Sequence, residues 1–236
     1  PCRMKYDKAV WAPSLRYRKG RIRNNVTYKP KVAVVHWSAG SADGEGLAKY
    51  MPAPTTVDKK TGQVKNRSAS YHFGIGRPGE IYQLVDTEDT AWHAGDGSFW
   101  KDGTIGHPSR VNEQSIGICL CNVGPVSLDK VKKDGVRYVE TPHNRAGFEA
   151  WKAFEAFTAE QRDSLVSLLA ALKVAHPELV YMVGHQDVTH GKGDPGPLFE
   201  NLDILNDLHY LQITRMVHDW NANPKLDTWH PLYAPQ

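Results

Sequence analysis

The chain has 236 residues, of which 40% are hydrophobic and 23% are charged. This length suffices for one α/β domain with a complete core, and the composition excludes wholesale disorder and a fibrous architecture. The net charge of +3 conceals an asymmetry, because residues 1–31 carry a net +9 and the remaining residues carry −6. The basic segment could attract anionic polymers, or it could form a solvated extension that lies over the domain.

The first predicted core element is the apolar run at residues 32–37 (VAVVHW), which is typical of a buried strand and brings His36 to its end. The segment 46–51 predicts a short helix that the following prolines stop. Residues 58–70 are polar and predict a surface loop.

Two further apolar stretches, residues 71–76 and 80–85, predict a hairpin joined by Arg-Pro-Gly. Another strand is expected at residues 115–121 (SIGICLC). We interpret the charged, irregular residues 123–147 as an inserted segment, with 136–139 as one strand of a hairpin.

The clearest helix is predicted from Thr158 to His176, because Thr158 and Gln161 form a capping box before a stripe of leucines. A strand at 179–183 follows and again leads to a histidine, His185. These elements predict three regions: a basic extension (1–31), a catalytic domain (32–214) and a C-terminal tail packed on that domain (215–236).

The chain has three cysteines, Cys2, Cys119 and Cys121, which are too few for a disulfide framework and favour free thiols in a reducing cytosol. No apolar run approaches the roughly 20 residues of a membrane span, and the basic N-terminus lacks the apolar stretch of a signal peptide. We therefore expect a monomer that is synthesised in the cytoplasm without a signal peptide or a transmembrane segment.

Candidate metal ligands follow the ends of two predicted strands, where open α/β sheets place their sites. His36 and His185 occupy these positions, and Asp194 follows in the glycine-rich sequence GKGDPGP. Two imidazoles and one carboxylate leave the fourth position of a tetrahedral Zn²⁺ open, as in hydrolases. The spacing alone is a weak indication, because most single histidines are hydrogen-bonded core or surface residues.

Five motifs make the pattern specific: VVHWSAG, SYHFGIGRPGEIYQLV, AWHAG, NEQSIGICL and GHQDVTHGKGDPGP. In this order they resemble the motifs of the type 2 N-acetylmuramoyl-L-alanine amidases, over about residues 32–200. That family includes amidase-type phage lysozymes, cytosolic anhydro-muropeptide amidases and animal peptidoglycan recognition proteins. The resemblance implies a single α/β domain with a central mixed β-sheet flanked by helices and a zinc site at the strand ends.

The resemblance also implies a zinc-dependent enzyme that hydrolyses the amide bond between the lactyl group and L-alanine of peptidoglycan. His36, His185 and Asp194 match the family's zinc ligands. Lys192 matches a lysine that stabilises the oxyanion of the reaction, although the same residue could be an exposed loop lysine.

One position departs from the pattern of the cytosolic members, which have a glutamate where this chain has Cys119. The phage lysozymes also have a cysteine there and use a tyrosine instead, which Tyr71 matches. The resemblance therefore assigns Tyr71 to position or activate the zinc-bound water, and Cys119 to the wall of the site.

His93 and Trp92, in AWHAG, match positions near the substrate. They could bind the muramyl or peptide portion, or they could form a structural aromatic pair.

Three alternatives stay open at this point. A protein of this fold could bind peptidoglycan without cutting it, or it could regulate another protein, as one phage relative binds a polymerase. The basic segment could indicate a nucleic-acid-binding protein, but no nucleic-acid fold signature accompanies it. We expect peptidoglycan or muropeptides as the partner and no nucleic acid, and a phage endolysin released through membrane holes, with a bacterial wall-recycling amidase as the second interpretation.

Overall fold

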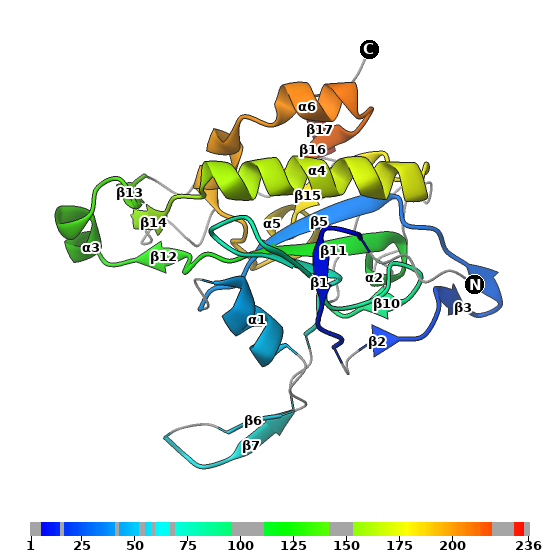
Figure 1. The fold of residues 1–236 in the computed structure, drawn as a ribbon, viewed down its shortest axis with the longest axis horizontal. Helices are drawn as coiled ribbons and strands as arrows, with labels where there is room; N and C mark the ends of the chain where they lie inside the picture. Colours follow the sequence, from blue (N-terminus) through cyan, green and yellow to red (C-terminus); the bar gives the residue numbers. More distant parts are fainter. Residues whose placement is uncertain are drawn as a thin grey trace.

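The protein is built around one mixed β-sheet, which the computed structural model shows with helices on both faces (Figure 1). The structure describes residues 6–14, 17–40, 43–51, 55–57, 60–66, 69–95, 111–141, 153–218 and 229–233. Cys2 and the last residues of the predicted insertion, 142–147, lie outside these ranges. The predicted fold class, a central mixed sheet flanked by helices, is confirmed.

Eight strands form the central sheet in the order β1 (Ala9–Trp11), β9 (Ile81–Gln83), β8 (Phe73–Ile75), β11 (Ser115–Leu120), β5 (Val32–Trp37), β15 (Tyr181–Gly184), β16 (Thr214–His218) and β17 (Trp229–Tyr233). The five strands from β8 to β16 run parallel. Strand β9 pairs antiparallel with β8, and β17 pairs antiparallel with β16. The parallel centre brings the carboxyl ends of β5, β11 and β15 to one edge.

The helical segments are α1 (Gly44–Tyr50), α2 (Val111–Gln114), α3 (Leu128–Lys133), α4 (Ala159–Ala175), α5 (His185–Val188), the 3₁₀ helix η1 (Pro197–Leu202) and α6 (Leu205–Tyr210). Short strands form separate small sheets: β2 (Tyr17–Arg18) with β10 (Thr90–Ala91), β3 (Ile22–Arg23) with β4 (Val26–Thr27), β6 (Thr55–Val57) with β7 (Val64–Asn66), and β12 (Pro125–Val126) and β13 (Tyr138–Glu140) on either side of β14 (Ala153–Glu155). Within the described residues, none of the helices combines the length and apolar character needed to cross a bilayer.

Helix α4 confirms the helix predicted from its capping box. The Thr158 hydroxyl accepts a hydrogen bond from the Gln161 backbone N–H, and the Gln161 side chain accepts one from the Thr158 N–H, both at 3.1 Å. Its leucine stripe, Leu165, Leu168, Leu169 and Leu172, is fully buried. Burying each leucine contributes about 1.5–3 kcal/mol, so packing against the sheet stabilises this helix more than its propensity does.

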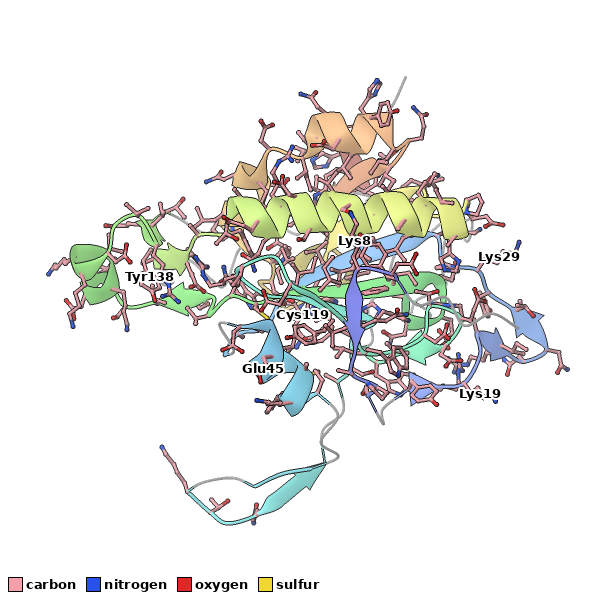
Figure 2. The ribbon with its side chains drawn as sticks, in the orientation of Figure 1. Lys8, Lys19, Lys29, Glu45, Cys119 and Tyr138 are labelled. Atoms are coloured by element: carbon pink, nitrogen blue, oxygen red, sulfur yellow. The ribbon has the colours of Figure 1, made fainter. Side chains whose placement is uncertain are left out.

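Alternation along β5 separates the two faces of the sheet. Ala33 and Val35 belong to the core cluster that contains the leucines of α4, whereas Val32 and Val34 belong to a second cluster. Because side chains alternate along a strand, His36 points to the face opposite α4. Cys119 is in register with His36 and packs with Leu47 and Ala48 of α1, so α1 covers part of that face (Figure 2).

Two local predictions were wrong. The polar residues 58–70 contain β7, which pairs with β6 across a turn where Gly62 has a φ of 69°. Backbone pairing across this glycine turn forms a hairpin despite the polar composition. The strand expected at 136–139 is Tyr138–Glu140, which pairs with β14 and not with a partner inside the insertion.

Residues from both flanks of the predicted catalytic domain join the sheet. Strand β1 pairs with β9 at one edge, and β16 and β17 extend the other. Arg21, in the basic segment, is 3% exposed and donates hydrogen bonds to the carbonyls of Thr87 and Glu113 at 2.8 and 2.7 Å. Strand β1 and Arg21 of the basic segment therefore lie against the domain, whereas residues 22–27 are exposed.

Candidate metal centre

The backbone places His36 and His185 on neighbouring strands of the sheet. His36 is the penultimate residue of β5, and His185 begins α5 directly after β15. These strands are parallel and in register, with Gly184 opposite Val35. The two histidines therefore meet at the edge formed by the carboxyl ends of the strands, as the sequence predicted.

Asp194 reaches the same edge through a tightly packed loop after α5. The backbone N–H of Gln186 donates to the Asp194 carbonyl at 2.7 Å and fixes the loop to the start of the helix. A Cβ at Gly184 would lie 2.7 Å from Pro195 Cδ, so only glycine allows this close approach. Gly196, with a φ of 84°, turns the loop against Trp37, where a larger residue would clash.

The donor atoms of the three residues converge. Asp194 Oδ2 lies 3.0 Å from His36 Nδ1 and 3.1 Å from His185 Nδ1. One donor atom from each residue lies within 4.8 Å of the others, and the three side chains form the candidate metal-binding group in the part of the chain that the structure describes. Relative exposures of 1%, 6% and 8% for His36, His185 and Asp194 place the group below the surface.

The electrostatics suit a cation among these atoms. Burial, assisted by the neighbouring His185, lowers the pKa of His36 to about 4, so its ring is neutral at pH 7. Burial opposes ionisation of Asp194, but its contacts with the rings of His185 and His36 outweigh it and lower the pKa of this carboxyl. A neutral imidazole and an ionised carboxylate are the states that metal ligands require.

Tyr71 and Cys119 form one wall beside His36. The Tyr71 ring centroid lies 5.0 Å from that of His36, and the ring packs against the cluster that contains Cys119. Burial, reinforced by Cys119, raises the pKa of Tyr71 well above its usual value, and burial also raises the pKa of the Cys119 thiol. Both groups therefore keep their protons at neutral pH.

The other predicted site residues occupy three different environments. Lys192 is exposed in the loop before Asp194, and its charge contributes to the lowered pKa of His36. Trp92 is 38% exposed, with the Arg18 guanidinium 5.8 Å from its ring centre. His93 is buried behind His36, where its Nδ1 lies 3.1 Å from His36 Nε2.

Sequence reasoning missed the support of α5. Asp187 Oδ2 accepts a hydrogen bond from the Gly184 N–H at 2.6 Å and one from Arg215 Nη1 at 3.0 Å. Arg215 is fully buried on β16 and also contacts Glu200 Oε1 at 2.6 Å. Asp187, Arg215 and Glu200 thus form a triad centred on the buried arginine. In the sequence, its only indication is an arginine within the short apolar stretch ITRMV.

Comparison with known families agrees with this geometry. The family model described as N-acetylmuramoyl-L-alanine amidase matches residues 26–197, a range that contains the three converging side chains. The chain belongs to this amidase family. The family resemblance found in the sequence motifs is thereby confirmed.

One curated protein and one solved structure show how similar this chain is to other proteins in sequence and in fold. The chain is 33% identical to N-acetylmuramoyl-L-alanine amidase AmiD of Escherichia coli (strain K12) over 173 residues, which are 72% of this chain and 50% of that protein. It therefore spans about half the length of this curated relative. The crystal structure of a selenomethionine derivative of AmpD has a TM-score of 0.58 at 24% identity, covering 89% of this chain and 97% of the other, and supports the fold.

Proposed function

We propose that this chain is a zinc-dependent N-acetylmuramoyl-L-alanine amidase that hydrolyses the amide bond between the lactyl group and L-alanine of peptidoglycan. The observation that carries the proposal is the buried convergence of His36, His185 and Asp194 in a member of this family. Zinc held by this open ligand set would supply a Lewis acid that polarises the amide carbonyl and lowers the pKa of water.

The donor set fits zinc better than a hard cation. Two imidazole nitrogens and one carboxylate are a common zinc set, whereas Mg²⁺ and Ca²⁺ prefer oxygen ligands. All three groups are buried, and Asp194 Oδ2 lies between the two rings, 3.0 Å from His36 Nδ1 and 3.1 Å from His185 Nδ1. We therefore assign the metal to these residues.

In this proposal Tyr71 positions the reacting groups and does not remove a proton. Its raised pKa keeps the phenol protonated, so the hydroxyl donates a hydrogen bond to the attacking water or to the carbonyl oxygen. Lys192 supplies a positive charge for the oxyanion as the amide carbon becomes tetrahedral. The C–N bond then breaks, the nitrogen of L-alanine takes a proton, and the other product is a lactyl carboxylate. Trp92, at the surface, remains the substrate-side residue of the proposal, whereas His93 lies behind His36 and affects the site through its contact with that ring.

Metal removal tests the proposal directly. Purified peptidoglycan is incubated with the protein as isolated, after a chelator, and after zinc is restored, and new L-alanine amino termini are counted. The proposal expects activity that disappears with the chelator and returns with zinc. A protein that holds zinc stoichiometrically and releases no amino termini would instead be a binding or regulatory member of the family.

Lys192→Ala separates catalysis from metal binding. Loss of a charge aimed at the oxyanion should lower kcat about 100-fold or more while bound zinc stays unchanged. Lys173→Ala, which removes a lysine at the far end of α4, serves as the control and should retain full activity. Equal losses of zinc and activity in Lys192→Ala would remove Lys192 from the catalytic machinery.

The biological setting that we propose is a phage endolysin. The packing of Tyr71 against the cluster that contains Cys119 supports it, because Cys119 occupies the position where the cytosolic amidases have a glutamate. Wall recycling by a bacterial amidase is the alternative. Faster cleavage of intact sacculi than of soluble anhydro-muropeptides would favour the endolysin, and the reverse would favour recycling.

A further inference from the structure

A row of hydrogen bonds lies behind His36, on the side away from Asp194. His36 Nε2 contacts His93 Nδ1 at 3.1 Å, and His93 Nε2 contacts Ser115 Oγ at 3.1 Å. Ser115 Oγ in turn lies 2.5 Å from the carbonyl oxygen of Val111. His93 is 5% exposed and Ser115 is fully buried, so the row is shielded from water.

The direction of each hydrogen bond follows from the last member of the row. The Val111 carbonyl can only accept, so Ser115 donates its one hydroxyl hydrogen to it. Ser115 Oγ must then accept a hydrogen bond from His93 Nε2. A second proton on His93 would place a charge in a buried site with uncharged partners, so the ring carries one proton and its Nδ1 is an acceptor.

His36 must then donate from Nε2 to His93, which leaves His36 Nδ1 without a proton. This nitrogen faces Asp194 Oδ2, which is also an acceptor, at 3.0 Å. Two acceptors at this distance repel each other unless a cation lies between them. In the opposite tautomer, His36 would donate a hydrogen bond from Nδ1 to Asp194. Nδ1 would then have no lone pair available for a metal ion.

Neighbouring residues hold His93 in the position from which it accepts the hydrogen bond of His36. Asn112 Oδ1 accepts hydrogen bonds from the backbone N–H groups of His93 and Ala94, at 3.1 and 2.9 Å. Gly117 provides the space for the ring, because a Cβ there would come within 2.6 Å of His93 Cγ. His93 is thus fixed by hydrogen bonding of its backbone N–H, by close packing of its ring at Gly117, and by hydrogen bonds at both ring nitrogens.

We propose that His93 and Ser115 keep His36 in the tautomer that leaves Nδ1 unprotonated, and so keep the centre open to a metal ion. This inference deepens the proposed function, because it takes His36 as a metal ligand. His93 is a positioning residue: it acts on the metal through His36 and does not touch it.

The tautomer itself is measurable in the metal-free protein. Long-range ¹H–¹⁵N spectra of histidine-labelled protein distinguish a protonated Nδ1 from a protonated Nε2, and His36→Gln identifies the signals of His36. The expected result is Nε2–H in the unsubstituted protein and a shift towards Nδ1–H in His93→Phe. Nδ1–H in the unsubstituted protein would overturn the proposal.

Zinc affinity gives a second readout that does not depend on turnover. Competition with a chelator should show about 10- to 100-fold weaker zinc binding for His93→Phe, the range typical of lost outer hydrogen bonds at zinc sites. His93→Gln should restore binding to near the original value, because an amide can accept from His36 and donate to Ser115. Ser115→Ala should weaken zinc binding by an intermediate amount and covers the case in which His93→Phe fails to fold.

A second buried histidine and hydroxyl pair provides the matched control. His176 Nε2 lies 2.9 Å from Thr87 Oγ1, and neither residue belongs to the candidate metal centre. Thr87→Val should leave zinc affinity unchanged. Unchanged affinity in folded His93→Phe would refute the proposal, whereas the expected tautomer and zinc affinity without cleavage of peptidoglycan would reject only the amidase activity.

Discussion

The two histidines of the candidate metal centre are held in different ways. The ring of His36 is fixed by hydrogen bonding through Nε2, and its backbone lies in β5 between two parallel neighbours. His185 Nε2 is buried but has no hydrogen-bond partner among the described residues. Its position depends instead on α5, which Asp187 and Arg215 hold in place.

The difference separates two kinds of support for a metal ligand. Orientation of His36 depends on residues within the family-matched segment, because β11 and β15 flank its backbone and His93, shortly after β10, contacts its ring. Orientation of His185 depends on β16, which lies beyond the segment 26–197 that matches the family. We therefore expect the C-terminal flank to determine the orientation of His185, and residues within the family-matched segment to determine that of His36.

Asp194→Ala should have the largest effect, because Asp194 is the group that both histidines share. Zinc content should fall to background and peptidoglycan cleavage should fall about 1000-fold or more, since two histidines alone form a poor zinc site. Metal analysis and the amino-terminus assay measure both. Asp163→Ala, at an exposed carboxylate on α4, is the control and should keep its zinc.

Arg215→Met should break the support of His185 alone. It leaves the Asp187 carboxylate buried without its cation, which costs about 3–5 kcal/mol of the free energy of unfolding. Arg162→Met removes a partly exposed arginine paired with Asp207 and should cost about 1 kcal/mol or less. Urea unfolding measures both variants, and equal losses would contradict the assigned role of the triad.

The variants Arg215→Met and His93→Phe should also differ in how they change stability and zinc affinity. Arg215→Met should lower both stability and zinc affinity, because α5 carries a ligand and is part of the packed structure. His93→Phe should lower zinc affinity more than stability, because it keeps the bulk of the ring. A folded Arg215→Met variant with normal zinc affinity would show that His185 does not need this support.

Acidification should destabilise the metal-free protein through His36. The unfolded chain binds this proton near pH 6.5, and the folded protein binds it near pH 4. Between these values the unfolded state holds more protons, so stability falls as the pH is lowered, by a contribution on the order of 3 kcal/mol. The free energy of unfolding measured across this window should show a smaller slope in His36→Gln, and an unchanged slope would contradict burial of a neutral His36.

The positions of the two candidate histidine ligands could be predicted because their signals are local. His36 follows a run of valines, His185 follows a second apolar strand, and Thr158 with Gln161 marks the start of α4. The supports were not predictable in this way: His93 meets Ser115, and Asp187 meets Arg215, across gaps in the chain that follow no helical or strand period. The strand β1 was equally hidden, because its three residues are too few to show a strand period and its place in the sheet depends on backbone pairing with β9.

Hydrolysis in H₂¹⁸O identifies the bond that the protein cleaves and the source of the new oxygen atom. A synthetic N-acetylmuramoyl peptide is incubated with the zinc-loaded protein, and the products are analysed by mass spectrometry. We expect one ¹⁸O atom in the lactyl carboxylate and an unlabelled peptide with a free L-alanine amine. An intact lactyl amide, or cleavage at another bond of the peptide, would contradict this expectation.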